Sequence, residues 1–257
     1  MKSALIKKIE GFVENYPVKQ ETETIWGKPL IGFADADDPL FYKLNKVASP
    51  THAVPNVFLN NAQTVIAFFL HFKKSMARTN IKEKNSSREW GIGYIETNEM
   101  IQQLSLYLKA SLKDMGHDAI VIPATHNWDE SKLISDWSHR HVAYIAGLGR
   151  FGLNNMLITN QGSCGRFGSF ITSADIMADP RPKKEACLYK HDGSCKKCVK
   201  RCVNDALHED SFNRFKCYDM LLENVETLKE IGYADVCGKC LVGVPCSHIN
   251  PVANKKG

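Results

Sequence analysis

The chain has 257 residues, of which 44% are hydrophobic and 24% charged, and its net charge is +5. This length suffices for one large core and a small appended module, and the composition excludes an intrinsically disordered protein. The longest apolar run, Thr64–Leu70, is far shorter than the roughly eighteen residues that cross a bilayer, and the N-terminus alternates apolar and charged residues, unlike a signal peptide. We therefore expect a soluble, cytoplasmic protein with no membrane partner.

The first half of the chain predicts alternating helices and strands. Apolar residues at helical spacing predict a first helix over residues 3–16. Strands are expected over Leu30–Ala34 and Thr64–Phe72, and the second is apolar enough to be covered on both faces. The polar stretch Lys73–Glu89 lacks periodicity, which indicates an exposed loop. A long amphipathic helix is then expected over Thr97–Met115.

The next eighty residues continue this pattern. Ala119–Pro123 is predicted as a strand, and Asn127–Ile134 as a loop that opens a short helix. His139–Gly149 is typical of a helix that ends in glycines. Met156–Thr159 and Ser169–Thr172 are predicted to form a pair of strands.

The composition changes near residue 180. Strands that alternate with helices indicate an α/β (α+β) domain over residues 1–180, whereas residues 181–257 have short helices and cysteines in place of sustained periodicity. From Arg181 to Cys217 there are ten basic residues against five acidic ones. This basic segment suits the docking of an acidic electron carrier or a phosphate-bearing substrate, and a plain solvated surface is the alternative.

The cysteines give the sharpest signal in the sequence. Eight of the nine lie between residues 187 and 246, and only Cys164 stands outside. Because thiols stay reduced inside cells, this clustering points to metal and not to disulfides. The motifs are Cys195-x-x-Cys198-x-x-x-Cys202 and Cys237-x-x-Cys240, with Cys246 six residues later, Cys187 before the first motif and Cys217 between the two.

A [4Fe–4S] cluster needs four thiolates, and in two-cluster ferredoxins the last cysteine of each run ligates the other cluster. On this pattern one cluster has the ligands Cys187, Cys195, Cys198 and Cys246, and the other has Cys202, Cys217, Cys237 and Cys240. Zinc is the alternative, because Cys₄ zinc sites also use paired C-x-x-C loops. Zinc ribbons space these pairs more closely, however, and zinc leaves Cys202 and Cys217 without a role.

At these residues the sequence resembles the epoxyqueuosine reductase family, which comprises cobalamin-dependent iron–sulfur enzymes related to reductive dehalogenases. The resemblance covers most of the chain from about residue 30 onward. It is carried by the cysteine motifs from Asp192 to Cys240 and by Ala146-Gly-Leu-Gly149-x-Phe-Gly152-x-Asn154-Asn155 with the segments Leu157-Ile-Thr and Gly168-Ser-Phe-Ile-Thr172. It implies a cobalamin-binding-type domain followed by a small ferredoxin-like module with two [4Fe–4S] clusters.

The resemblance further implies an oxidoreductase. A donor such as flavodoxin or ferredoxin would supply electrons, which would pass through the two clusters to a bound corrinoid and on to a small molecule or modified nucleoside. The positions that the resemblance assigns to cofactor binding are Gly147, Gly149, Asn154, Leu157, Tyr218 and Gly238. For Gly147 and Gly149 the alternative is a plain helix C-cap.

The chain departs from the family pattern at three points. Asp192 stands where the family has a ligand cysteine, so we expect Cys187 to substitute, with the Asp192 carboxylate as the alternative. The proton-donating Asp of the family falls on Leu133, which leaves Asp136 and His139 as candidate catalytic residues. The sequence also lacks the helical-repeat extension that contributes to tRNA binding in the family, which weakens tRNA as a substrate.

Functions of other classes fit the same cysteines. A corrinoid-free, ferredoxin-like electron carrier, or a reductive activator of a partner protein, would hold clusters but take up no corrinoid, and it would dock through the basic segment. A zinc-stabilised nucleic-acid-binding module is a third hypothesis, which predicts colourless protein because thiolate-bound iron is brown.

Overall fold

The computed structural model describes residues 1–123, 128–129 and 131–254. Its centre is a four-stranded sheet in the order β1-β2-β8-β3, in which every neighbouring pair is antiparallel. These strands are β1 (Leu30–Asp35), β2 (Thr64–His71), β3 (Ala119–Val121) and β8 (Gly165–Thr172). Two short hairpins accompany the sheet, one of β4 (Trp128–Asp129) and β5 (Ile134–Ser135) and one of β6 (Gly149–Phe151) and β7 (Leu157–Thr159).

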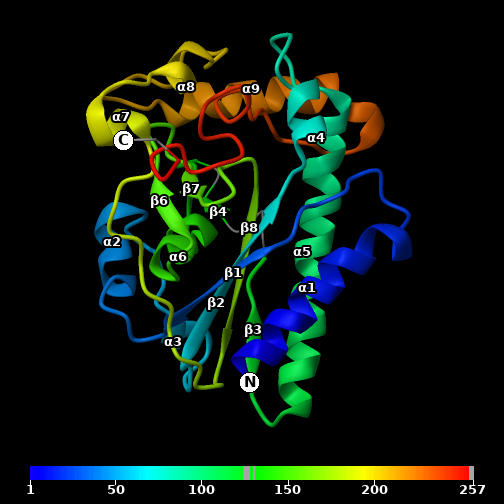
Figure 1. Ribbon diagram of the computed structural model, residues 1–257, viewed down its shortest axis with the longest axis vertical. Coiled ribbons are helices and arrows are strands. Elements are labelled where there is room, and N and C mark those ends of the chain that lie inside the picture. Colours follow the sequence, from blue (N-terminus) through cyan, green and yellow to red (C-terminus); the bar gives the residue numbers. More distant parts are fainter. Residues whose placement is uncertain (124–127, 130, 255–257) are drawn as a thin grey trace.

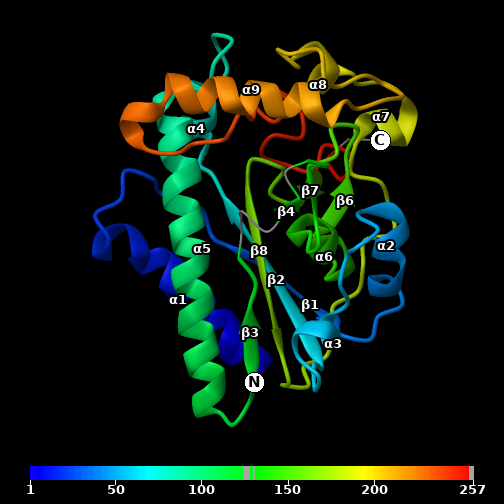
Figure 2. The ribbon, with the colours of Figure 1, turned by 180° about the vertical axis from the view of Figure 1, so that it is seen from behind.

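Helices cover both faces of this sheet, so the predicted mixed α/β fold is confirmed. They are α1 (Lys2–Lys19), η1 (Phe41–Lys43), α2 (Leu44–Val47), α3 (Pro55–Phe58), α4 (Lys74–Thr79), α5 (Arg88–Asp114), α6 (His139–Ile145), α7 (Leu188–Asp192), α8 (Lys197–Lys200), α9 (Arg214–Thr227) and η2 (Lys229–Ile231). The helices α1 and α5 lie on one face, α2, α3 and α6 lie on the other, and α7 to α9 cross one end (Figures 1 and 2). Within the described residues, no helix combines the length and apolarity that crossing a membrane requires.

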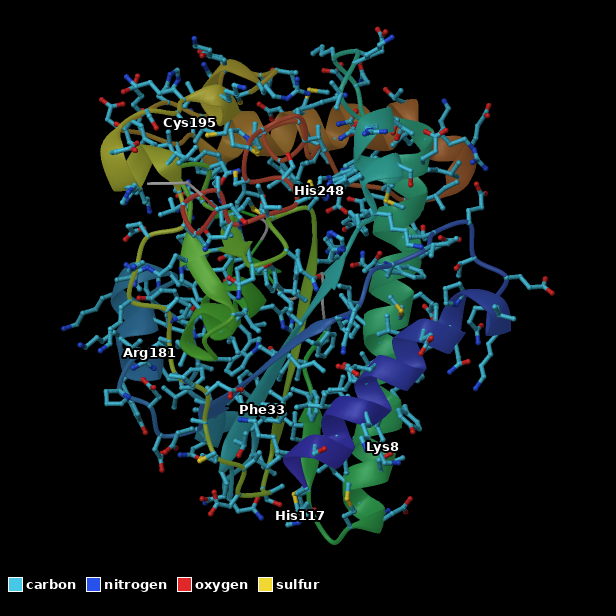
Figure 3. The ribbon with its side chains drawn as sticks, viewed as in Figure 1. Lys8, Phe33, His117, Arg181, Cys195 and His248 are labelled. Carbon is cyan, nitrogen blue, oxygen red and sulfur yellow. The ribbon has the colours of Figure 1, made fainter. Side chains whose placement is uncertain are left out.

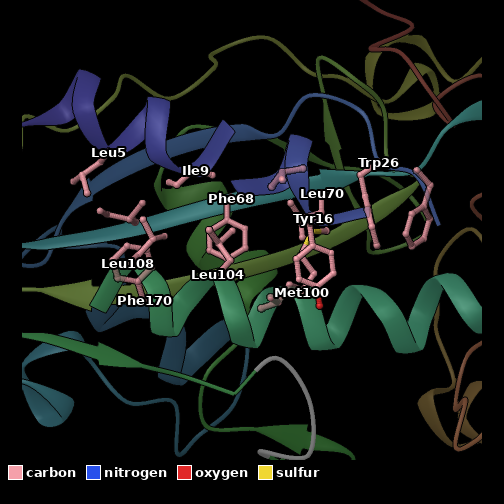
Figure 4. Close-up of a cluster of buried hydrophobic side chains, with 14 of the residues drawn as sticks. Leu5, Ile9, Tyr16, Trp26, Phe68, Leu70, Met100, Leu104, Leu108 and Phe170 are labelled. Atoms are coloured by element: carbon pink, nitrogen blue, oxygen red, sulfur yellow. The ribbon is translucent and has the colours of Figure 1, made fainter. Parts of the chain in front are cut away.

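The larger core lies between the sheet and the helices α1 and α5. Apolar residues of α1 recur at intervals of four, as at Leu5, Ile9 and Val13, and all three are buried. They meet Phe68 of β2 and Leu104 of α5 (Figure 4). Because both faces of the sheet are covered, β2 is buried from Thr64 to Leu70, as its apolar sequence predicts.

The opposite face of the sheet is closed by α6 and the short helices. Phe69 of β2, Trp137 and Val142 belong to the core on this side. The indole Nε1 of Trp137 donates a hydrogen bond to Ser169 Oγ of β8 at 3.0 Å. This contact fixes the start of α6 against the sheet, and the residues around it form a wall of the site described below.

The cysteine-rich segment is packed onto the sheet domain. Leu241 and Val242 belong to the core that α1 and α5 form. The backbone N–H of Cys164 donates to the carbonyl of Ser247 at 3.0 Å. Cys195 and His248 lie at the same end of the molecule (Figure 3). The division of the chain at residues 180 and 181 stays a prediction.

Two predictions around α4 and α5 are wrong. Lys73–Glu89 is not a loop throughout, since it contains α4 and the first two residues of α5, and α5 begins nine residues before the predicted Thr97. The glycines Gly91 and Gly93 disguise this start, because glycine lowers helix propensity. A Cβ at Gly91 would come within 2.8 Å of Leu228 and Ile231. Tertiary packing therefore demands a small residue where sequence periodicity favours a larger one.

The predicted pairing of Met156–Thr159 with Ser169–Thr172 is also wrong. The first segment contributes β7, which pairs with β6 from Gly149 onward, while β8 pairs with β2 and β3. The local sequence does not reveal which distant strand will pair with a given one, and β2 and β8 are about a hundred residues apart. Asn127–Ile134 was predicted as a loop that opens a short helix, and Asn127 and Glu130 of it lie outside the described residues. Its described residues form β4, a turn and the first residue of β5.

Candidate iron–sulfur and substrate site

The structure brings together the first predicted set of four thiols. Cys187, Cys195, Cys198 and Cys246 line one small cavity. Burial, and next the nearby Cys187 thiol, raise the pKa of Cys246 to about 12 and that of Cys198 to about 11. Three separated segments of the chain therefore supply four sulfur atoms to one place.

The second predicted set lines a different cavity of about 270 Å³, whose wall includes Cys202, Cys217, Cys237 and Cys240. Cys217 lies in the first turn of α9, which begins after Asn213, whose side chain accepts a hydrogen bond from the N–H of Lys216. Burial, followed by the Cys237 and Cys202 thiols, raises the pKa of Cys217 to about 11. The ligand roles of both sets remain our proposal.

Asn154 connects the two sets. Its side chain is buried, belongs to the walls of both cavities and donates from Nδ2 to the carbonyl of Cys240 at 3.1 Å. The pKa of Cys240 is raised first by burial and by its own set, and then by the Cys198 thiol of the other set. The two cavities are thus neighbours that share the Asn154 side chain as a wall residue.

The donor groups around the second cavity fit an iron–sulfur cluster. Deprotonating four buried thiols is costly without a compensating cation, which the iron of a cluster supplies. The buried Nε1 of Trp90 also lines this cavity and has no hydrogen-bond partner among the described residues. Cluster sulfur would accept from this indole N–H.

A single metal ion fits less well. Within the described chain, no three His, Cys, Asp or Glu side chains lie close enough to hold one ion. A cubane cluster binds each thiolate through a different iron, so its ligands stand further apart than those of one ion. Spacing that is too wide for one ion is compatible with a cluster.

The structure separates the two candidates for the fourth ligand of the first set. Cys187 is buried and belongs to the cavity wall. Asp192 ends α7, accepts a hydrogen bond from the N–H of Ser194 at 3.0 Å and is not among the described residues of that wall. Cys164 belongs to neither set, since its buried thiol donates to the carbonyl of Leu241.

The glycines assigned to a corrinoid have structural reasons of their own. Gly147 follows α6 with φ +81°, and a Cβ there would lie 2.7 Å from the carbonyl oxygen of Pro180. A Cβ at Gly149 would lie 2.3 Å from the carbonyl oxygen of Ile158. Both glycines therefore allow the chain to approach itself, in agreement with the C-cap alternative for Gly147.

Leu157, Tyr218 and Gly238 occupy three different environments. Leu157 is fully buried in the core beneath α6. Tyr218 lies in α9 directly after Cys217. Gly238 lines the second cysteine cavity with φ +70°, and a Cβ there would lie 2.4 Å from the ring of Trp90.

A further cavity of about 310 Å³ adjoins the second cysteine set, and the two share Met156, Gly165 and Arg166 as wall residues. This volume is at the lower end for a small-molecule site, and a corrin ring with its amide side chains is far larger. The described residues of this cavity therefore do not fit a corrinoid, and we derive no step through one.

The predicted catalytic residues have different surroundings. Asp136 is exposed, accepts a short hydrogen bond from the Thr51 hydroxyl and is not among the described wall residues of these cavities. His139 is a wall residue, but its Nδ1 lies 2.7 Å from Ser169 Oγ and its Nε2 lies 2.9 Å from the carbonyl of Pro123. Burial lowers the pKa of His139 to about 4, so it is neutral at pH 7. Its contacts indicate that it positions the wall.

Sequence analysis missed Arg140 and Arg166, which both line this cavity. A usable signal was present for Arg166, because a single cation inside the otherwise apolar segment that forms β8 must either reach solvent or face a polar site. Trp90 was missed because it lay between the predicted loop, which ends at Glu89, and the helix predicted from Thr97.

The architecture is that of two kinds of reductase. An epoxyqueuosine reductase solved with an epoxyqueuosine-modified tRNA-Tyr stem loop matches 94% of this chain and 66% of its own, with a TM-score of 0.53 and 20% identity. A catabolic reductive dehalogenase in complex with 3-bromo-4-hydroxybenzoic acid matches 87% of this chain and 30% of its own, with a TM-score of 0.59 and 15% identity. At these identities the likeness establishes the fold alone.

The sequence itself is similar to a curated epoxyqueuosine reductase of Bacillus anthracis, with 27% identity over 207 residues and 77% of this chain. The chain spans about half of that relative's length, with 50% covered. No family model matches the chain. These findings confirm the resemblance to epoxyqueuosine reductase that the motifs predict.

Proposed function

We propose that the protein is an iron–sulfur oxidoreductase that uses two [4Fe–4S] clusters to reduce a small molecule or a modified nucleoside. The observation that carries this proposal is the convergence of eight cysteines into two sets of four at neighbouring cavities. When bound, the clusters would supply one-electron transfer at low potential. The similarity to reductases does not favour the electron-carrier hypothesis.

The chain would hold the two clusters close together and direct electrons inward. The two sets line neighbouring cavities that share Asn154, and Cys198 of the first set packs in one cluster with Cys202 and Cys240 of the second, which keeps the distance between the sets short. The loop between α7 and α8, which carries Cys195, is exposed at one end of the molecule (Figure 3). We expect a donor such as flavodoxin or ferredoxin to reach the first set there, while the second set adjoins the substrate cavity.

The basic segment is partly neutralised by its own acids. Lys196 pairs with Glu209 at 2.6 Å, and Lys216 pairs with Asp205 at 3.2 Å. These exposed pairs are weak and screened by salt. Donor docking through this segment is therefore expected to depend on ionic strength. A tRNA stem loop bound to a solved relative makes a nucleoside in tRNA one candidate substrate.

The decisive experiment is anaerobic reconstitution followed by iron and acid-labile sulfide analysis. We expect about eight irons and eight sulfides per chain, and about half as many after Cys198→Ser or Cys240→Ser. Cys164→Ser is the matched control, because this buried thiol belongs to neither set and its serine can still donate to the carbonyl of Leu241. Two zinc ions in place of iron and sulfide would refute the proposal.

Cobalamin remains a prediction from the family resemblance. Corrin analysis of the anaerobically purified protein tests it directly. One corrinoid per chain would support it, whereas iron-loaded protein that takes up no cobalamin would refute it.

A further inference from the structure

The cavity of about 310 Å³ beside the second cysteine set carries two guanidinium groups, from Arg140 and Arg166. The described part of its wall contains no Asp or Glu, and His139 is neutral there at pH 7. Neither arginine forms an ion pair with a described carboxylate. The described part of the cavity wall therefore has an excess of positive charge.

Of the two guanidinium groups, that of Arg166 has the less complete hydrogen bonding. Its Nε is buried and has no hydrogen-bond partner among the described residues. Its Cζ lies 4.3 Å from the centroid of the Tyr94 ring, so the guanidinium is stacked on an aromatic face. Burial lowers the pKa of Arg166, and the Asp235 carboxylate acts in the opposite direction. That carboxylate, however, accepts a hydrogen bond from the Tyr94 hydroxyl and lines the other cavity. A donor on Arg166 thus remains unused.

Arg140 lies between the cavity and the cysteines. Its Nη1 donates to the carbonyl of Asn155 at 2.9 Å and contacts Met156 Sδ at 3.1 Å. Burial lowers its pKa, while the Cys217 and Cys240 thiols act in the opposite direction.

We propose that this cavity binds a small organic acid, with the carboxylate held by Arg166 and Arg140 and the apolar body packed on Met156 and Phe167. Both guanidinium groups are half-buried at one cavity, and the nearby Asp235 carboxylate already accepts a hydrogen bond from Tyr94, so the two cations favour an added anion. The planar guanidinium fork matches a carboxylate in two parallel hydrogen bonds. The volume suits a small molecule. This inference rests on the proposed function, since the acid would bind beside the second cluster.

The test is calorimetric titration of the reconstituted holoprotein with benzoate, with its neutral analogue benzamide and with inorganic phosphate. We expect saturable binding of benzoate and at least tenfold weaker binding of benzamide and phosphate. Arg166→Gln should weaken benzoate binding at least tenfold. Arg88→Gln is the matched control, because Arg88 is exposed and pairs with Glu23 far from this cavity, and it should leave binding unchanged.

Arg166→Lys keeps the charge but loses the fork, and we expect affinity between those of the native protein and of Arg166→Gln. The comparison of benzoate with benzamide needs no variant, so it decides the question even if a variant fails to fold. The inference would be overturned if benzamide or phosphate bound as tightly as benzoate. It would also be overturned if Arg166→Gln bound benzoate as tightly as the native protein does. Iron analysis of the same samples separates the two proposals. Protein that has its full iron content but does not bind benzoate refutes the acid site and leaves the proposed function standing. Zinc-loaded protein refutes the proposed function.

Discussion

Replacing Gly238 with alanine tests the packing of the second cysteine set. Gly238 has φ +70°, and an added Cβ would lie 2.4 Å from the ring of Trp90. Trp90 is only 2% exposed and is a wall residue of the cavity that the cysteines line, so displacing its ring disturbs that wall. Gly116 provides a matched control, since it has φ +82° and nothing lies within 4 Å of its added Cβ.

The two variants share one cost and differ in another. A left-handed backbone costs a residue with a Cβ about 1–2 kcal/mol, and both variants incur this. Overpacking of a close-packed core costs about 1–3 kcal/mol more, and only Gly238→Ala incurs it. We therefore expect Gly238→Ala to lose about 2–5 kcal/mol of stability and Gly116→Ala about 1–2 kcal/mol.

Urea unfolding of the reconstituted protein, followed by fluorescence and by bound iron, measures the difference. With a slope of about 3 kcal/mol per molar urea, the extra cost lowers the midpoint of Gly238→Ala by about 0.3–1 M relative to Gly116→Ala. Gly238→Ala should also retain less iron, because a displaced Trp90 ring enters the cluster space. Equal midpoints and equal iron contents for the two variants would refute this reasoning.

Three further outcomes follow from the site. Cys217→Ser should abolish the spectroscopic signal of one cluster and leave the other, since Cys217 lines only the second cavity; loss of both signals would contradict this assignment. Trp90→Phe removes the unpartnered indole N–H and should lower the reduction potential of the second cluster by about 50 mV in a redox titration. Trp26→Phe is the control, because the indole N–H of Trp26 is hydrogen-bonded within the core, and it should leave that potential unchanged. The pKa of His139 is lowered to about 4 by burial, so unfolded chains bind more protons between about pH 4 and 6.5 and stability falls as the pH drops through this window. His139→Gln should flatten the dependence of the urea midpoint on pH between pH 4.5 and 7, and a dependence as steep as that of the native protein would count against this role.

Much of the chain could be predicted from local pattern. The apolar spacing in α1 and the continuous apolar run of β2 indicate both elements. A buried helix face or a fully buried strand requires apolar residues at short, regular intervals, and such intervals can be recognised in the local sequence. The two groups of cysteines were likewise predicted from the spacing of Cys195, Cys198 and Cys202 and from the family resemblance. In the structure, the four cysteines of each set line one cavity.

Other features depend on contacts between distant segments. The start of α5 was missed because Gly91 is required by Leu228 and Ile231, which lie more than a hundred residues further along the chain. The partner of β8 was missed because hydrogen bonds between distant strands impose no local periodicity. Likewise, nothing near Arg166 in the sequence reveals that it lies over Tyr94.

The sequence alone determined the chemistry that this protein can support, because thiols at ferredoxin-type spacing can be recognised without knowing where they lie. Only the tertiary structure decided which neighbours those thiols have. It brought Trp90 and Arg140 to the second cysteine set and opened a cationic cavity beside it. The physical reason is that charge and hydrogen-bonding balance in a buried site is set by residues from many segments, and it exists only once the chain has folded.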